Sequence, residues 1–178
     1  MLGQTTRILA AVAADSVARV RRILNRHDLV IVHDSEHAKN EWDRGVRLVF
    51  VSARFDDSHM YEFLDYLRTH VHRQRIPVVA AIVMPTNLSA VAIQGMDLST
   101  KLYGASVFVN FNEFQDDDIG NSRLRLIVEA LIIPEDVMPV VEQVLQRPKA
   151  YPAGTVASGN RCATSSRRRS ARSALKPK

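Results

Sequence analysis

Residues 48–67, LVFVSARFDDSHMYEFLDYL, contain the pattern that decides the fold. The first four residues, LVFV, form a short continuous apolar run, which is typical of a strand buried on both faces of a parallel sheet. A polar loop follows, and Ser58 can cap a helix after it. The apolar residues of that helix recur at the i, i+3, i+4, i+7 spacing of one helical face, and they are Met60, Phe63, Leu64 and Leu67. The segment therefore predicts one buried strand followed by one amphipathic helix.

The same alternation runs through residues 7–132. Further short apolar runs occur at 7–14, 29–32, 78–83 and 107–109, and segments with helical spacing or caps separate them. Parallel strands need crossover connections, and the helices in those crossovers cover both faces of the sheet. The sequence therefore predicts an α/β fold with a doubly wound, five-stranded parallel sheet. Ligands of such sheets bind at the carboxyl ends of the strands.

Three helices carry more detailed expectations. In the first, for which Asp15-Ser16 offers a cap, the arginines are expected to face water, and they are Arg19, Arg21 and Arg22. The second is expected to have Ser35 as its cap. The last helix of the domain is expected to span residues 121–132, where the apolar residues again share one face.

Charge is divided unequally along the chain. The formal net charge is +5, but residues 147–178 hold nine Lys and Arg and no Asp or Glu; since the chain has 24 basic residues in all, the remainder holds 15 basic and 19 acidic residues. The segment 147–178 is rich in Ser, Arg, Ala, Pro and Gly, and we expect a disordered basic tail. The tail either keeps the chain in solution or binds a polyanion such as DNA or RNA without sequence specificity. The candidate polyanion-binding residues are Arg167, Arg168, Arg169, Arg172, Lys176 and Lys178.

Residues 133–146 predict one additional helix, because their apolar side chains recur at helical spacing. This helix either packs on the domain or pairs with a partner or a second copy. The expected organisation is a domain at 1–132, an extra C-terminal helix at 133–146 and the tail at 147–178.

The composition excludes several function classes. The single cysteine, Cys162, rules out an internal disulfide and a multi-cysteine metal site, and it fits a reducing compartment. No apolar run is long enough to span a membrane, so we expect a cytoplasmic protein. No dinucleotide-binding turn, Walker loop, nucleophile elbow or zinc-hydrolase motif occurs. We therefore predict neither an enzyme nor a cofactor, and the histidines have no spacing that favours a metal site.

Four strings along the chain resemble the receiver domain of bacterial response regulators of the chemotaxis-regulator type. They are RIL at 7–9, LVFV at 48–51 before an acidic loop and an amphipathic helix, RIPVV at 75–79 and YGASVFVNF at 103–111. Their order and spacing span nearly all of residues 6–132. The resemblance implies the flavodoxin-like topology of receivers and a role in two-component signal transduction or a phosphorelay.

The positions that carry receiver chemistry hold other residue types in this chain. Receivers place a phosphoryl group on an Asp that ends strand three, beside an acidic pair that binds Mg²⁺ after strand one, a Ser or Thr after strand four and a Lys after strand five. Carried over one at a time, the acidic pair falls on Val12 and Ala13 or their neighbour Ala14, and the acceptor falls on Ser52. The hydroxyl position falls on Ile82 or Val83, with Thr86 displaced beyond Pro85, and the lysine position falls on Asn110. Because a carboxylate nucleophile needs the metal and the ammonium to offset the charge on the phosphoryl oxygens, the resemblance implies a degenerate pseudo-receiver. Whether Asp56 or Asp57, farther into the loop, accepts phosphate stays open.

The resemblance also implies a partner surface. In receivers, helix four, strand five and helix five form the face that binds a second copy or a partner. The candidate residues here are Tyr103, Phe108 and Phe111, although an aromatic residue in a buried strand more often belongs to the core. The expected function is a phosphorylation-independent signalling and protein-interaction module. The alternative is a nucleic-acid-associated regulator that uses the basic tail.

Overall fold

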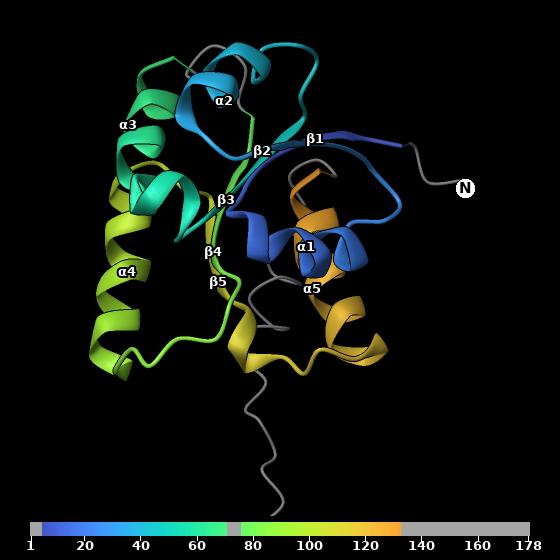
Figure 1. Ribbon diagram of the computed structural model, residues 1–178, viewed down its shortest axis with the longest axis vertical. Coiled ribbons are helices and arrows are strands. Elements are labelled where there is room, and N and C mark those ends of the chain that lie inside the picture. The colour runs from blue at the N-terminus through green and yellow to red at the C-terminus, as the bar shows by residue number, and fades with distance from the viewer. Residues whose placement is uncertain (1–4, 71–75, 133–178) are drawn as a thin grey trace, which may run out of the picture. The chain divides into compact units, whose positions relative to one another are not determined.

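The computed structural model describes residues 5–70 and 76–132. Its strands are β1 Arg7–Ala11, β2 Asp28–Val32, β3 Leu48–Ser52, β4 Val78–Ile82 and β5 Val107–Asn110. All neighbouring strands are parallel, and their order in the sheet is β2-β1-β3-β4-β5 (Figure 1). The predicted five-stranded parallel sheet is therefore confirmed.

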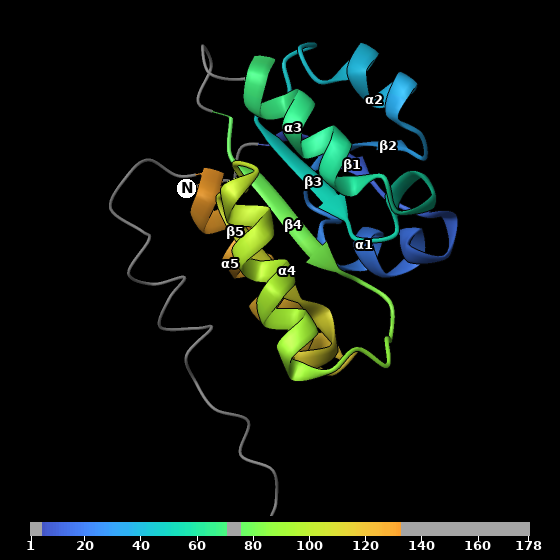
Figure 2. The same ribbon diagram turned by 90° about the vertical axis from the view of Figure 1, so that its left-hand side faces the viewer.

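Helices cover both faces of this sheet, as the crossover argument predicts. They are α1 Val17–Ile23, α2 Ser35–Glu41, α3 Met60–His70, α4 Ala90–Leu102 and α5 Asp118–Ile132. The helices α1 and α5 pack on one face, and α2, α3 and α4 pack on the other (Figure 2). The sheet is therefore doubly wound.

The central strands supply both cores, because successive side chains of a strand point to opposite faces. In β3, Val49 and Val51 pack on the side of α2, α3 and α4, whereas Leu48 and Phe50 pack on the side of α1 and α5. All four side chains are buried. The continuous apolar runs in the sequence reflect this burial on both faces.

Two helices begin where neighbouring capping residues place them. The cap of α2 is Asp34, whose Oδ1 accepts a hydrogen bond from the His37 amide at 2.9 Å, and Ser35 is the first helical residue. In α5, Asp117 Oδ1 accepts from the Gly120 amide at 2.7 Å, so the helix begins three residues earlier than predicted. The predictions of Ser35 as the cap and of residue 121 as the start of α5 are corrected accordingly.

The predicted extra helix at 133–146 and the tail at 147–178 lie outside the described residues. Within the part of the chain that the structure describes, no helix combines the length and the apolar character needed to cross a membrane.

Candidate functional site

The carboxyl edge of the sheet brings the predicted receiver positions together. The pairing of β3 with β4 sets Ser52 beside Ala81, and the pairing of β4 with β5 sets Ile82 beside Asn110. Val12 directly follows β1, and its amide donates to the Val32 carbonyl at 3.0 Å. Parallel strands thus deliver these side chains to one edge of the sheet.

Ser52, at the expected phosphoacceptor position, is buried. Its exposed fraction is 1%, and its Oγ has no hydrogen-bond partner within the described residues. By strand alternation it lies on the same face as Leu48 and Phe50, which belong to the core beneath α1 and α5. Val12 and Ile82 are also buried. The edge therefore presents apolar side chains and one buried hydroxyl.

Asn110, at the expected lysine position, stabilises a turn. Its Oδ1 accepts from the Asn112 amide at 3.1 Å, and its Nδ2 donates to Glu113 Oε1 at 3.3 Å. These contacts cap the 3-10 turn Phe111–Glu113 that follows β5. The amide side chain thus organises the local backbone.

The carboxylates in the adjoining loops are engaged with neighbouring groups. Asp15 lies in the 3-10 turn before α1, where its Oδ2 accepts from Arg54 at 2.7 Å and its Oδ1 accepts from Ser16 Oγ at 3.0 Å. Ser16 stands at the N-cap position of α1, but its Oγ donates to Asp15 and makes no capping hydrogen bond to the helix. Asp56 Oδ2 accepts from both the amide and the Oγ of Ser35, at 3.1 and 2.5 Å. The hydrogen bonds between Asp56 and Ser35 connect the β3–α3 loop to the first turn of α2.

The β3–α3 loop has an unusual backbone. Asp56, Asp57 and Ser58 have φ values of 47°, 51° and 78°, in the left-handed region that residues with a Cβ seldom adopt. The contact between Asp56 and Ser35 holds this conformation in place. No glycine marks the turn in the sequence, so sequence patterns do not reveal it.

Arg19 crosses from α1 to the ends of β4 and β5. Its guanidinium donates to the carbonyl oxygens of Val83, Phe111 and Phe114, at 3.2, 3.0 and 3.0 Å, and it lies 5.4 Å from the centre of the Phe111 ring. Burial lowers the pKa of Arg19, and the nearby carboxylate of Asp116 opposes that shift. The prediction that Arg19 faces water is wrong.

The sequence holds one signal for this inward position. Arg19 is four residues before the buried Ile23, so it lies at the border of the apolar face of α1. A long side chain at such a border can bury its stem while its charged end reaches polar groups. The acceptors themselves lie more than sixty residues away in sequence, and no local pattern identifies them.

A cavity of about 300 Å³ opens at the same edge, beside the β3–α3 and β4–α4 connections. The residues that line it are mostly apolar or carry hydroxyls, with Arg54 as the charged one: Ser16, Ala53, Arg54, Ser58, Met60, Tyr61, Ile82, Met84, Thr86, Leu88 and Met96. No carboxylate is among the described residues that line this cavity. Elsewhere in residues 5–70 and 76–132, no group of three or more His, Cys, Asp or Glu residues is placed to hold a metal ion.

The predicted partner residues separate into one surface residue and two core residues. Tyr103 is 39% exposed, whereas Phe108 and Phe111 are 8% and 1% exposed. Phe111 packs against Phe50, with ring centres 5.8 Å apart. The assignment of Phe108 and Phe111 to a partner surface is therefore corrected, because both side chains are enclosed by the core.

Exposed apolar side chains occur instead on α4. Val91, Leu98 and Leu102 are 77%, 65% and 80% exposed, and their spacing places them on one side of the helix. We call these three residues the α4 stripe. On α5, Ile119 and Leu126 are also exposed. The helix α4 packs beside β5, the edge strand of the sheet (Figure 2).

No protein-family model matches this sequence, and no curated protein matches it significantly. Solved structures do share its fold. A chain of the co-crystal structure of the Saccharomyces cerevisiae histidine phosphotransfer signaling protein Ypd1 and the receiver domain of its downstream response regulator Ssk1 is 12% identical, with a TM-score of 0.54 over 74% of this chain and 90% of that one. The Mn²⁺-bound form of response regulator Rcp1 is 14% identical, with a TM-score of 0.53 over 73% of this chain and 99% of that one. The receiver domain of the Francisella response regulator 1452 is 14% identical, with a TM-score of 0.52 over 72% and 97%.

These similarities extend over nearly the whole of each receiver domain. Together with the strand order and the distribution of helices, they define the class of fold. The described part of this chain has the fold of response-regulator receiver domains.

Proposed function

We propose that this chain is a signalling module that retains the receiver fold and works without accepting a phosphoryl group. The observation that carries the proposal is the chemistry of the strand ends: Val12, Ser52, Ile82 and Asn110 stand where the resemblance to receivers leads us to expect carboxylates, a hydroxyl and an ammonium. Mg²⁺ requires oxygen ligands, which the side chains of Val12 and Ala13 do not offer. These residues do not fit the metal, so we assign no phosphoryl-transfer step.

The state of the neighbouring carboxylates supports the same proposal. Asp15 is paired with Arg54, and Asp56 holds the first turn of α2 through Ser35. A phosphoryl group attached to Asp56 Oδ2 would displace both hydrogen bonds from Ser35. The structural role of Asp56 thus accounts for an acidic residue in the loop without phosphoryl chemistry.

The direct test is incubation of the full chain with acetyl phosphate and Mg²⁺, followed by intact-mass measurement. We expect no phosphorylated species, while a receiver that retains its acceptor Asp, treated in parallel, becomes labelled. The variants Asp56→Asn and Asp57→Asn complete the design. Labelling of the wild-type chain that either variant abolishes would identify a displaced acceptor and contradict the proposal.

The α4 stripe supports a protein partner as the means of signalling. Exposed aliphatic side chains on one side of a helix are costly to leave in water, and exposed apolar surface is typical of protein contacts. The structure of Ssk1 with Ypd1 is one case in which a domain of this fold forms a complex with a signalling protein. We propose a cytoplasmic protein partner for the stripe, and a second copy of this chain is the partner to test first.

The partner surface is tested by sedimentation of the full chain over a range of concentrations. We expect concentration-dependent self-association in the wild type and its loss in Leu98→Glu/Leu102→Glu. The control is Asn40→Glu, which adds one negative charge, half that of the double variant, to an exposed position of α2 and should leave self-association unchanged. A wild-type chain that stays monomeric, or a double variant that still associates, would exclude a homodimer through α4.

A second candidate function rests on the segregation of charge in the sequence. Residues 147–178 carry nine basic residues and no acidic one, which favours binding to the phosphate backbone of DNA or RNA. These residues lie outside the described part of the chain. The expected outcome is nucleic-acid binding that weakens steeply as salt rises and disappears when residues 147–178 are deleted. Binding that survives the deletion would reject this function for the tail.

A further inference from the structure

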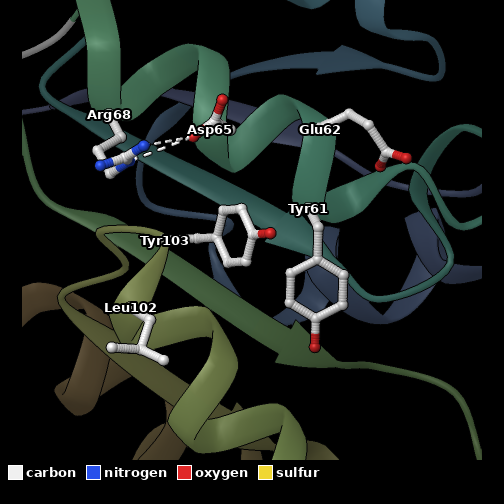
Figure 3. A pocket seen from close by; sticks show the side chains of 6 residues that line it. All are labelled: Tyr61, Glu62, Asp65, Arg68, Leu102 and Tyr103. Carbon is white, nitrogen blue, oxygen red and sulfur yellow. Dashed lines mark hydrogen bonds and ion pairs between the residues drawn. The ribbon is translucent and has the colours of Figure 1, made fainter.

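A groove of about 480 Å³ lies between α3 and the end of α4, and it shares Tyr61 with the cavity at the carboxyl edge of the sheet. It is lined by Tyr61, Glu62, Asp65, Arg68, Leu102 and Tyr103. Figure 3 shows the two tyrosine rings side by side in the groove, with the charged side chains along α3 and Leu102 on α4. The lining therefore combines aromatic faces, carboxylates and one exposed aliphatic side chain.

The tyrosine rings form the apolar wall of the groove. The ring centres of Tyr61 and Tyr103 are 5.3 Å apart, and the ring planes are inclined by 50°. Burial raises the pKa of Tyr61, so its phenol stays neutral at physiological pH. The face of a neutral aromatic ring attracts a cation through the quadrupole of its π electrons.

The carboxylates differ in what they already bind. Asp65 Oδ1 accepts from Arg68 at 2.7 Å, and this pair remains at the groove (Figure 3). Glu62 is exposed and makes no hydrogen bond or ion pair within residues 5–70 and 76–132. Among the described residues Glu62 therefore has no hydrogen-bonded or ion-paired group, and its charge adds to the rise in the pKa of His59, which comes chiefly from the hydrogen bond to the Asp56 carbonyl.

We propose that this groove binds the guanidinium of an arginine side chain of a protein partner, with Glu62 as its ion pair and the Tyr61–Tyr103 wall as its stacking surface. A planar guanidinium donates two parallel hydrogen bonds to a carboxylate and stacks on an aromatic face, which an ammonium does less well. Leu102 belongs both to this groove and to the α4 stripe, so one partner can cover both. The inference rests on the proposed function because it assumes a protein partner at the α4 stripe. It adds that this partner presents an arginine side chain.

The experiment titrates the isotopically labelled full chain with the peptide Ac-Ala-Leu-Arg-Ala-NH2 and follows the ring and amide NMR signals of Tyr61 and Tyr103. We expect saturable shifts at these residues and at Glu62. Replacing the arginine of the peptide by citrulline, which is neutral and nearly isosteric, should raise the Kd at least tenfold. Replacing it by lysine should raise the Kd about threefold, because the bidentate contact is lost.

Variants of the chain separate the two parts of the site. Glu62→Gln should weaken binding about fivefold, whereas Asp43→Asn, at an exposed carboxylate in the turn after α2, should leave the Kd unchanged. Tyr103→Phe should also leave it unchanged, since the ring remains. Tyr103→Leu should weaken binding about 2- to 5-fold, which corresponds to the ~0.5–1 kcal/mol of an exposed cation–π contact. The amide spectrum of each variant verifies that it is folded.

Three results would overturn the inference. They are equal affinity for the citrulline peptide, shifts that map outside the groove, and affinity for tetramethylammonium that matches the arginine peptide. The last result would assign the groove to a small quaternary cation. The titration uses no phosphate donor and no partner protein. Phosphorylation of the chain by acetyl phosphate would therefore contradict the proposed function without affecting the peptide-binding result.

Discussion

Two glycines in helices differ in the space around them. An added Cβ at Gly120, in the first turn of α5, would lie 2.0 Å from the Gln115 carbonyl oxygen, whereas at Gly95, in the middle of α4, it would meet nothing within 4 Å. Backbone atoms cannot move aside as a flexible side chain can. The same substitution should therefore have opposite effects at the two positions.

Gly120→Ala should destabilise the chain by about 1–3 kcal/mol, because the cost of overpacking exceeds the gain in helix propensity. Gly95→Ala should stabilise it by about 0.5–1 kcal/mol, since alanine restricts the unfolded chain and favours the helix. Urea unfolding monitored by circular dichroism measures both. A Gly120→Ala variant as stable as the wild type would show that the turn at Gln115 adjusts freely.

Arg19 provides a second test at the residue scale. Its guanidinium donates to three backbone carbonyls, of which the Phe111 carbonyl also accepts from the Phe114 amide. Arg19→Met keeps the apolar stem and removes the donors, and we expect a loss of about 2–4 kcal/mol from unsatisfied, partly buried carbonyls. Arg21→Met, on the exposed side of the same helix, should change stability by less than about 0.5 kcal/mol. Equal effects of the two substitutions in urea unfolding would contradict the role of the guanidinium.

At the element scale, the start of α2 couples a helix cap to a titrating histidine. The Asp34 side chain lies 2.6 Å from His37 Nδ1 while it also caps the helix. The pKa of Asp34 is lowered, chiefly by the hydrogen bond from the His37 amide, and the pKa of His37 is raised, chiefly by the hydrogen bond to the Asp34 side chain. The stabilisation of the folded state by the protonated His37 ring is complete below the pKa of His37 in the unfolded chain, and it is lost as the pH rises through the raised pKa. The stabilisation by the ionised Asp34 carboxylate is complete above the pKa of Asp34 in the unfolded chain, and it is lost as the pH falls through the lowered pKa. The pair therefore supports α2 most between the ordinary pKa of Asp34, 3.8, and the ordinary pKa of His37, 6.5.

Asp34→Asn should lower the pKa of His37 toward its ordinary value of 6.5 while leaving α2 formed, because an asparagine oxygen still caps the helix. The measurement is an NMR titration of the His37 ring in both proteins. Asp43→Asn, which removes a charge just beyond α2, is the control and should leave the His37 titration where it is. An unchanged His37 pKa in Asp34→Asn would show that the ion pair does not form in solution.

The strands and helices were predictable because their signals are local. A run such as residues 48–51 is apolar throughout since both faces of the strand are covered, and α3 shows its buried face in its own spacing. The cap of α2 was displaced by one residue because Asp34 and Ser35 are both good capping residues. Local patterns therefore fix which elements form more reliably than where each one begins.

The site was predictable in its positions and less so in its contacts. Strand order alone brings Ser52, Ile82 and Asn110 to one edge. In contrast, the hydrogen bonds of Arg19 and the left-handed backbone at 56–58 depend on groups distant in sequence. The residue types at these positions do not identify the acceptors or the backbone conformation. The burial of Phe111 likewise depends on Phe50, sixty-one positions earlier, so its own neighbourhood in the sequence could not reveal it.

At the scale of the whole molecule, the two cores share one sheet. Trp42, the single tryptophan of the chain, packs on the side of α2, α3 and α4, whereas Leu124 is buried on the side of α1 and α5. Because β1, β3 and β4 contribute to both cores, the two sides should unfold together. The fluorescence of Trp42 should therefore respond to a destabilising substitution on the opposite face of the sheet.

Leu124→Ala should lower the free energy of unfolding by about 2–5 kcal/mol and shift the Trp42 fluorescence transition together with the circular dichroism transition. Leu126→Ala, exposed on the same helix, should leave both transitions in place. If the fluorescence transition stayed fixed while circular dichroism became biphasic, the two sides would be separate folding units.

The contacts of Arg19 have a consequence for synthesis of the chain on the ribosome. Its acceptors at Val83, Phe111 and Phe114 are made 64, 92 and 95 residues after it. At typical translation rates, roughly 5–20 s pass before the last of them exists. Throughout that delay Arg19 lacks its last acceptors, although β2 and β3, the neighbours of β1 in the sheet, are complete once residue 52 has been made.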